Sequence, residues 1–392
     1  MDFILSLIDH YGTAEWTLLA LLFASFTIQI IFYLVLYRKP YSFLKKQEKQ
    51  MNPAPEEWPP VSVIIASKNH SEELKKNLPP ILQQDYPRFE VIVVNCGSTD
   101  ETDIVLNALQ LQYPHLYHTY VPAETDVVTE KKLALTLGIK AAKNELLLFT
   151  EAYCRPCSDR WIRAFAREFS KGKEIVLGGS RLRMSKEVGL HRFIQYDNLI
   201  HHLKFLSMAI AQKTYMGIGR NMAYRKAIFF NNKGYSSILS IDDGEDDLFI
   251  NKIARGKKTG VLLSTESMTE TDGIDRFSDW RTLKSKYLYT QQYYKGFAVR
   301  LFGWETFSKY LFYTAFIAAM IKGIYGNDYL FAGAAILFFL IRYGIQLTVI
   351  NHNSRMFQAG RYHIHLLFFD LLQPLNNARF RRYANRRNHF RH

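Results

Sequence analysis

The sequence predicts an α/β domain, built on a doubly wound parallel β-sheet, with membrane-spanning helices at both ends of the chain. Two β-branched runs, which begin at Val61 and Phe89, each stop at small polar residues. Such runs are typical of buried parallel strands whose carboxyl ends face a ligand crevice. Long segments without charge near both ends of the 392 residues are the second observation. The third is the acidic segment 244–249, which opens onto an apolar, helix-like run.

Strands and helices alternate through the first part of this domain, which we place at residues 58–290. The expected elements, in order, are a strand from Val61, a helix over 72–84, a strand over 89–94, a helix over 100–112, a short strand over 116–121, a helix over 131–142 and a strand over 146–149. This alternation predicts right-handed crossovers and a doubly wound sheet. Residues 193–211 form an amphipathic stretch, which indicates a helix packed on the sheet or one lying on a membrane.

The first membrane span is predicted over residues 16–37, which carry no charge and are long enough to cross a bilayer of roughly 30 Å. The run is too long for a cleaved signal peptide, and basic residues follow it rather than precede it. A hairpin of two further spans, around 310–325 and 329–350, turns at 326–328 and contains Arg342. With three crossings, and basic residues after the first, we expect the bulk of the chain to be cytoplasmic.

The predicted organisation is an amino-terminal anchor (1–37), a basic linker with prolines (38–57), the α/β domain (58–290), an interfacial segment with the hairpin (291–350), and an interfacial helix with a basic tail (351–392). This describes a multi-pass protein of the cytoplasmic membrane. Six arginines crowd the tail: Arg379, Arg381, Arg382, Arg386, Arg387 and Arg391. They indicate an anchor on anionic lipid headgroups, with nucleic-acid binding as the weaker alternative.

Charge and cysteine content restrict the partners and the cofactors. The net charge of +14 favours an anionic partner, which is a nucleic acid, a lipid surface or a phosphorylated substrate. Three cysteines on the cytoplasmic side argue against a disulfide framework. Cys154 and Cys157 have redox spacing but lack the following helix of a thioredoxin site, and Cys96 alone does not complete a zinc quartet.

Four segments give the chain a resemblance to membrane-anchored family 2 glycosyltransferases, which have the GT-A nucleotide-sugar fold. They are the strand end 63–69, the helix end and strand 84–94, the turn 95–102, and the lysine pair 131–132 with Ala134 and Leu135. The resemblance covers about residues 60–290. It implies an inverting transferase that moves a sugar from a nucleotide-sugar donor to a lipid-linked or glycan acceptor at the cytoplasmic face, in cell-envelope polysaccharide synthesis. The alternative is a catalytically silent relative that serves as a membrane binding or scaffold subunit.

The resemblance implies that the first strand end and the turn after the second strand hold the nucleotide. Donor binding is therefore assigned to Ala66, Ser67, Asn69, Asn95, Cys96, Lys131 and Tyr153. Cys96 stands where the family has an aspartate, so recognition of the nucleotide base weakens or shifts to Asn95. The alternative is that Cys96 is only a small buried residue. Lys131 or Lys132 would neutralise the negative charge of the donor diphosphate. The alternative is that both are solvated lysines at the start of a helix.

The family also implies a divalent cofactor, Mg²⁺ or Mn²⁺, held by an Asp-x-Asp motif after the strand 146–149. A hard ion of this kind takes oxygen ligands and cancels charge on the leaving group. In this chain Glu151 stands for the first carboxylate and neutral Tyr153 for the second. The metal site is therefore remodelled around Glu151 or lost.

The acidic segment resembles the family motif whose carboxylate takes the proton from the acceptor hydroxyl. Two alignments leave Asp246 and Glu245 as the candidate base, with Asp246 preferred, and Asp247 is assigned to the catalytic group with them. The structural alternative is that the acidic group caps a helix, where negative charge is favoured in any case.

On the acceptor side, the resemblance points to Gly219, Asn221, Arg225 and Tyr287. Glycine lets the backbone approach a sugar closely, and the polar side chains offer hydrogen-bond donors. Tyr287 lies where processive relatives have Gln-x-x-Arg-Trp, with Leu283 and Lys286 in the places of Gln and Arg. The sequence therefore predicts a single transfer rather than a platform for a growing polymer.

Overall fold

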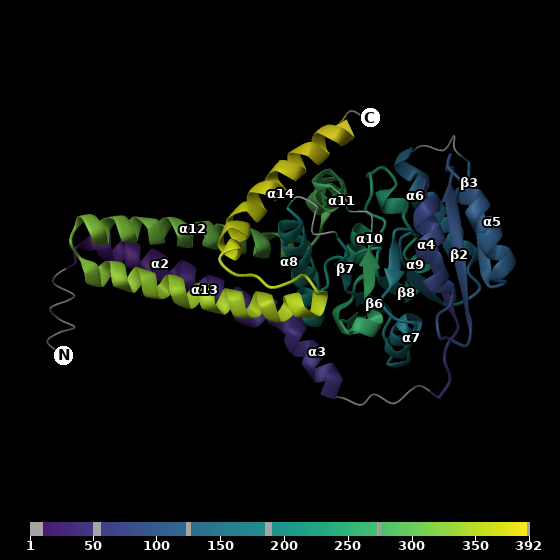
Figure 1. Cartoon of the computed structure of the whole chain (residues 1–392), viewed down its shortest axis with the longest axis horizontal. Coiled ribbons are helices and arrows are strands. Elements are labelled where there is room, and N and C mark those ends of the chain that lie inside the picture. The colour runs from purple at the N-terminus through teal and green to yellow at the C-terminus, as the bar shows by residue number, and fades with distance from the viewer. Residues whose placement is uncertain are drawn as a thin grey trace. The chain divides into compact units, whose positions relative to one another are not determined.

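The computed structural model describes residues 11–49, 56–122, 127–184, 190–272, 274 and 276–389 (Figure 1). It divides into two compact units. The helical unit comprises the described residues up to Lys39, Phe297–Asn353 and Arg361–Leu375. The α/β unit comprises Pro40–Gly296, Ser354–Gly360 and the described residues from Asn376 onwards. The predicted linker prolines Pro53 and Pro55 lie outside the described residues.

The α/β unit contains a seven-stranded sheet in the order β3-β2-β1-β4-β8-β6-β9. Its strands are β1 (Val61–Ser67), β2 (Phe89–Cys96), β3 (Leu116–Val121), β4 (Leu146–Phe149), β6 (Ile175–Gly178), β8 (Met222–Arg225) and β9 (Thr259–Leu262). The parallel arrangement is confirmed for β1 to β4, whereas β8 runs antiparallel to both of its neighbours. A second sheet, β5-β10-β7, consists of β5 (Cys154–Pro156), β10 (Thr269–Thr271) and β7 (Ser180–Leu182).

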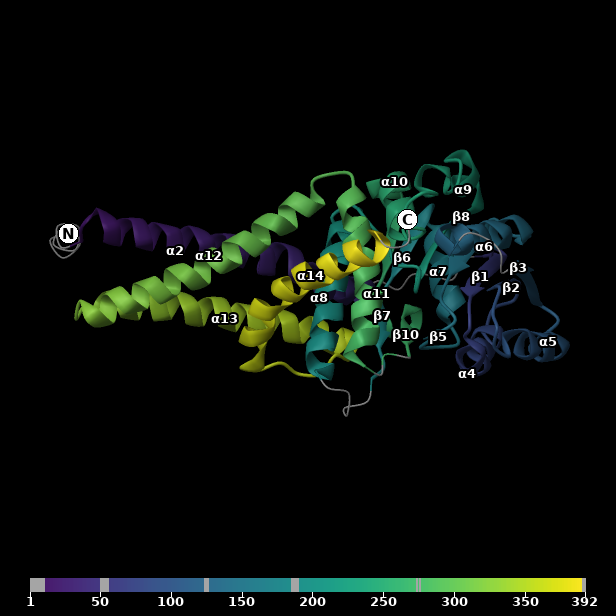
Figure 2. The same ribbon diagram turned by 90° about the horizontal axis from the view of Figure 1, so that it is seen from above.

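Helices of this unit cover both faces of the large sheet. In chain order they are α3 (Lys39–Lys49), α4 (Ser71–Leu82), α5 (Thr102–Gln112), α6 (Val127–Ala141), α7 (Trp161–Ser170), α8 (His191–Ile210), α9 (Lys226–Asn231), α10 (Asp247–Ile253) and α11 (Phe277–Thr290). Helices α4 and α5 lie on one face of β1 to β3, and α6 lies on the other (Figure 2). The predicted helix over 193–211 is α8, which contacts β7 and β9 and so packs on the sheets.

Alternation along β1 explains how its two faces are filled. Val63 and Ile65 are fully buried in the core that α4 completes with Leu78. The intervening Ile64 points to α6, where Gly138 approaches it so closely that an added Cβ would lie 2.9 Å from its Cγ2 atom. A β-strand turns successive side chains to opposite faces, so this strand is buried on both sides.

Most of the basic tail is part of a helix, and the anchoring of its arginines on anionic lipid headgroups stays a prediction. Helix α14 (His365–His389) continues from the helical unit into the α/β unit at Asn376. Phe380 is buried in a cluster with Trp280 and Leu288 of α11. The guanidinium of Arg281 lies 4.3 Å from the ring centre of Tyr383. Side chains of Arg387 and Arg391 lie outside the described residues.

The helical unit consists of α2 (Thr13–Ile31), a π-helical stretch (Phe32–Tyr37), α12 (Ala298–Tyr325), α13 (Tyr329–Phe357) and the first part of α14. In the described part of the chain, Thr13–Lys49 and Tyr329–Phe357 are long and apolar enough to cross a membrane, by length and composition only. These two correspond to the first and third predicted spans. The second predicted span is helical, as α12, but this helix is not among those that meet the criteria of length and apolar composition.

Arg342, the charged residue predicted within a span, is fully buried and paired. Its guanidinium lies 2.9 Å from the Asp370 carboxylate and 3.0 Å from the Gln29 amide oxygen. Asp370 also pairs with Lys309 at 2.8 Å, and Lys309 pairs with Glu305 at 3.1 Å. We call Glu305, Lys309, Arg342 and Asp370 the buried ion network. Its two positive and two negative groups balance, which is what charges away from water require.

Candidate active site

The candidate site lies at the carboxyl edge of the parallel strands. Ser67, the last residue of β1, is opposite Asn95 near the end of β2. On the other side of β1, Ile64 is opposite Phe149, the last residue of β4, so Glu151 follows at the same edge. The polar residues predicted from three separate strand ends are therefore neighbours.

The turns after β1 and β2 are joined by hydrogen bonds. The Asn69 side-chain oxygen accepts from the Thr99 backbone N–H at 2.8 Å, and the Asn69 N–H donates to the Ser98 hydroxyl at 2.8 Å. Asn95 accepts from the Ser98 N–H at 3.0 Å and donates to Asp103 at 2.6 Å. These amides shape the turns.

Ser67 and Ala66 are both buried at the end of β1, and the Ser67 hydroxyl has no hydrogen-bond partner within the described residues. A buried hydroxyl without a partner is costly, so a ligand at this edge would relieve it.

Cys96 carries no charge at neutral pH. Burial, with a smaller contribution from Glu130, raises the pKa of its thiol to about 12. It therefore does not replace the charge of the aspartate that the family resemblance expects there, and the alternative of a small buried residue fits. Burial also raises the thiol pKa of Cys154 to about 12 and of Cys157 to about 11, which leaves the pair without a reactive thiolate.

Lys131 joins two carboxylates from different parts of the chain. Its Nζ atom lies 2.7 Å from Oε1 of Glu151, after β4, and 2.8 Å from Oε1 of Glu245, before α10. We call Lys131, Glu151 and Glu245 the clasp. Burial opposes the charge of Lys131, but the two carboxylates raise its pKa well above the ordinary value. Burial likewise disfavours ionised Glu245, yet Lys131 and Lys286 lower its pKa to about 2.

The neighbouring Lys132 has a different environment. Its Nζ donates a hydrogen bond to the backbone carbonyl of Ile241, and burial lowers its pKa. Of the two lysines considered for the diphosphate, Lys131 is therefore the one at the strand edge.

Asp246 is buried and fixed by three hydrogen bonds. Its Oδ2 atom accepts from the Gly219 N–H at 2.7 Å and from the Tyr287 hydroxyl at 2.9 Å. Its Oδ1 atom accepts from the Asp247 N–H at 2.7 Å, so Asp246 also caps α10. Burial and the charge of Glu245 raise its pKa to about 6. Helix capping and a base poised near neutrality are thus both properties of this carboxyl group.

The surroundings of Asp247 indicate a structural role. It is fully buried, and its carboxylate accepts hydrogen bonds from the Thr290 hydroxyl and, at 2.6 Å, from the Tyr294 hydroxyl. Burial and Asp246 raise its pKa well above the ordinary value. It links α10 to α11 and to the segment that follows, which is a structural role, and its assignment to the catalytic group stays a prediction.

Two of the four predicted acceptor residues lie beside the clasp. Gly219 donates to Asp246, and Tyr287 reaches the same carboxylate from α11. Asn221 lies in the core instead, where its amide contacts the Trp161 indole and two backbone carbonyls. Arg225 is opposite Leu146, at the far end of β4 from Glu151, so the structure corrects its assignment to the acceptor side.

The cleft around these groups is small, with a cavity of about 20 Å³. It is lined by Lys131, Glu151, Tyr153, Asp243, Gly244, Glu245, Asp246, Asp247, Leu283, Lys286, Tyr287 and Thr290. A cavity of this size holds a water molecule but no sugar. Binding of a sugar in this cleft would require side chains that line it, such as Tyr153 and Tyr287, to move.

Sequence reasoning missed Thr290 and Tyr294, which contact Asp247. Lys286, noted in the sequence only as the residue in the place of an arginine, pairs with Asp243 at 3.2 Å. One signal was available for Thr290. It follows Leu283 and Tyr287 at intervals of four and three residues, a spacing that places all three on one helix face.

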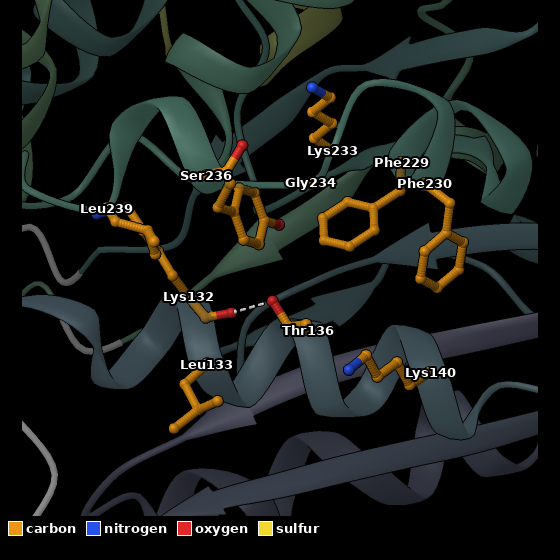
Figure 3. Close-up of a pocket in the computed structure, with 11 residues that line it drawn as sticks. Lys132, Leu133, Thr136, Lys140, Phe229, Phe230, Lys233, Gly234, Ser236 and Leu239 are labelled. Carbon is orange, nitrogen blue, oxygen red and sulfur yellow. Dashed lines mark hydrogen bonds between the residues drawn. The ribbon is translucent and has the colours of Figure 1, made fainter.

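A second, larger cavity of about 520 Å³ lies between α6 and α9 (Figure 3). It is lined by Lys132, Leu133, Thr136, Lys140, Phe229, Phe230, Lys233, Gly234, Tyr235, Ser236 and Leu239. Its size is that of small-molecule sites. Of the residues considered for the donor, the acceptor or the metal, its lining includes Lys132 alone.

Comparison with known proteins agrees with this geometry. Residues 62–230 match the family model described as glycosyl transferase family 2. The poly-beta-1,6-N-acetyl-D-glucosamine synthase of Staphylococcus epidermidis is 27% identical over 194 residues, which are 48% of this chain and 44% of the relative. Glycosyltransferase AglE of Haloferax volcanii is 28% identical over 127 residues, 31% of this chain and 39% of that protein. The chain thus matches less than half the length of these relatives.

Among solved structures, the mannosyltransferase PcManGT from Pyrobaculum calidifontis, in complex with GDP-Man and Mn²⁺, superimposes with a TM-score of 0.55. The match covers 87% of this chain and 97% of that one, at 18% identity. At this identity the likeness concerns the fold.

Proposed function

The chain is a family 2 glycosyltransferase with the GT-A fold, and on this premise we propose that it transfers one sugar, with inversion, from a nucleotide-sugar donor to a lipid-linked or glycan acceptor at the cytoplasmic face of a membrane. The observation that carries the proposal is the environment of Asp246. Its carboxyl group has a pKa of about 6, is held by Gly219 and Tyr287, and lies next to the clasp at the edge of the sheet.

In the proposed reaction, the nucleotide lies against the ends of β1 and β2, near Ser67 and Asn95. Asp246 accepts the proton of the acceptor hydroxyl as its oxygen forms a bond to the anomeric carbon. The bond from that carbon to the diphosphate breaks in the same step, and the negative charge passes to the leaving nucleoside diphosphate. Glu245, with a pKa of about 2, is the poorer base, which favours the alignment that places the base at Asp246.

A divalent ion is a candidate cofactor, because PcManGT was solved with Mn²⁺. Such ions prefer several oxygen ligands, usually including ionised carboxylates. No group of three His, Cys, Asp or Glu residues that could hold a metal is found in the described ranges. The predicted ligand Glu151 is paired with Lys131, and burial and Glu151 raise the pKa of Tyr153 well above its ordinary value, so it is a neutral phenol. The residues as placed do not fit Mg²⁺ or Mn²⁺.

The alternative function, a silent scaffold subunit, is supported by neutral groups at Cys96 and Tyr153 where charged ones are expected. A nucleotide panel separates the two functions. We expect UDP or GDP, or a sugar derivative of one of them, to raise the unfolding temperature of the purified protein, because only the folded state binds it. If no nucleotide in the panel has this effect, the scaffold function is favoured.

We propose a multi-pass membrane protein whose α/β unit faces the cytoplasm. The proposal is supported by two helices of the chain that are long and apolar enough to cross a membrane. The acceptor is then a molecule that is itself held at the membrane.

The pH dependence of transfer should report Asp246. The base must be ionised, and its pKa of about 6 means that kcat/KM falls about tenfold per pH unit below pH 6 and is flat above it. Tyr287→Phe removes a hydrogen bond that favours the ionised form of Asp246, so the pKa of Asp246 should rise. The fall of kcat/KM in acid should then begin at a higher pH. The measurement is kcat/KM from acid to neutral pH, with Tyr293→Phe, at an exposed tyrosine, as control. An acid limb that is the same in all three proteins would contradict the assignment.

Gly219 should tolerate no side chain. A Cβ atom there would lie 3.1 Å from the Glu151 carboxylate and 3.3 Å from that of Asp246, so both groups must shift by a few tenths of an ångström. Because small displacements of reacting groups are costly, we expect Gly219→Ala to lower kcat by up to roughly 10²-fold. Gly303→Ala is the matched control, since nothing lies within 4 Å of its added Cβ. Equal kcat in both variants would show that Gly219 does not position the carboxylates.

A further inference from the structure

We propose that Lys131 is the built-in cation of the donor site, so that its ammonium group takes the place of a divalent ion and the donor diphosphate binds without added metal. This inference rests on the proposed function. It concerns the counter-charge of the leaving group, not the identity of the base.

The geometry of the clasp is the first argument. The Lys131 ammonium lies between the carboxylates of Glu151 and Glu245, at 2.7 and 2.8 Å. The family resemblance makes Glu151 a metal ligand. In this structure the Lys131 ammonium already contacts the Oε1 atom of Glu151. The two carboxylate side chains are only 12% and 7% exposed, so their attraction to the lysine is little screened by water.

The hydrogen-bonding capacity of Lys131 is the second argument. An ammonium group has three N–H donors. Two of them face the clasp carboxylates. The third donor remains for a phosphate oxygen, and the side chain is 32% exposed, enough for a ligand to reach it. Lysine binds phosphate as a compact point charge in other sites of this kind.

Charge balance is the third argument. A motif with two carboxylates after β4 would place two negative charges next to a diphosphate, which requires a divalent ion. Here Tyr153 stands in the second position, so Glu151 is the one carboxylate that remains of the pair. Lys131 pairs with Glu151 and Glu245, and Lys286 supplies a second positive charge near Glu245. A divalent ion placed beside Lys131 would meet a like charge at close range, or would have to displace it.

The test is calorimetric titration of UDP and GDP into the purified full-length protein, treated with a chelator, with and without Mg²⁺ or Mn²⁺. For the wild type we expect nucleotide affinity that added metal changes by less than about twofold. Lys131→Met keeps the length of the side chain but removes the charge. It should lower affinity in chelator by roughly tenfold or more, as expected for a lost hydrogen bond to a charged group.

The variant also makes a distinctive prediction about metal. Without the ammonium, Glu151 and Glu245 are free to bind Mn²⁺, so added Mn²⁺ should restore part of the affinity of Lys131→Met. The double variant with Glu151→Gln should not be restored. Lys131→Arg keeps a charge and should bind nucleotide in chelator, which separates loss of charge from misfolding. Lys140→Met, at an exposed lysine of α6, should behave as the wild type.

Wild-type nucleotide binding that disappears in chelator and returns with Mn²⁺ would overturn this inference and leave the proposed function in place. Lys131→Met with unchanged affinity in chelator would also overturn it. Absence of nucleotide binding by the wild type under every condition would instead overturn the proposed function, and the inference with it.

Discussion

Asp246→Asn is expected to abolish sugar transfer, with a loss of about 10²–10⁴-fold in kcat, while donor affinity stays close to that of the wild type. Asparagine is nearly isosteric and its amide oxygen can still accept from the Gly219 N–H. It cannot accept a proton from the acceptor hydroxyl, so transfer is lost. Its NH2 group also forfeits the hydrogen bond that Oδ1 accepts from the Asp247 N–H, which lies away from the donor nucleotide. The measurement is transfer rate beside nucleotide affinity, for the variant and the wild type.

The control is Asp85→Asn, which removes a surface carboxylate that pairs with Arg163. It should transfer sugar at the wild-type rate. If Asp246→Asn keeps full turnover while Glu245→Gln is inactive, the base is Glu245. Full activity in both would mean that the acidic segment is not the reaction centre.

Asp370→Ala should give the largest loss of stability. Asp370 pairs with Arg342 at 2.9 Å and with Lys309 at 2.8 Å, and all three are buried. Removal of the carboxylate leaves buried cations without their partner, for which a loss of about 3–5 kcal/mol is typical. Thermal unfolding in detergent measures the effect, which should be a clear fall in unfolding temperature.

Glu48→Ala is the matched control for this substitution. Glu48 pairs with Lys45 at 2.8 Å, but both side chains are about half exposed, and such pairs contribute roughly 0–1 kcal/mol. An unfolding temperature of Asp370→Ala equal to that of Glu48→Ala would contradict the structural role of the buried ion network.

The sequence was most informative where apolar patterns are long and local. The strands predicted over 116–121 and 146–149 match β3 and β4 residue for residue, and the predicted helices coincide with α4, α5 and α6 to within a few residues. β5, β7 and β10 were missed, because three-residue strands carry no readable alternation. Their sheet also forms only when segments more than eighty residues apart, such as Pro156 and Thr269, meet.

The candidate site was predicted only in part, because some of its residues follow readable strands and others meet only in the folded chain. Ser67, Asn95 and Glu151 follow strands whose order could be read, so their common edge was foreseen. The bridge from Lys131 to Glu245 was not, because it joins α6 to the segment before α10 through the fold alone. The assignment of Arg225 to the acceptor side was wrong. Gly219 lies beside Asp246, whereas β8 carries the chain away from the site at about 3.3 Å per residue and places Arg225 opposite Leu146.

The pairing of Arg342 likewise depends on tertiary structure. A charge in an apolar segment is costly in isolation, and its partner Asp370 belongs to another helix. Nothing in the local pattern of residues 329–350 indicates this partner.

The most direct test of the central claim is the anomeric configuration of the product, measured by NMR after purified wild-type protein transfers an isotope-labelled sugar from a nucleotide donor to a membrane-associated acceptor. A single displacement with Asp246 as base predicts that the transferred sugar has the configuration opposite to that in the donor. Retention of configuration, or the absence of transfer from any nucleotide sugar that the protein binds, would contradict it.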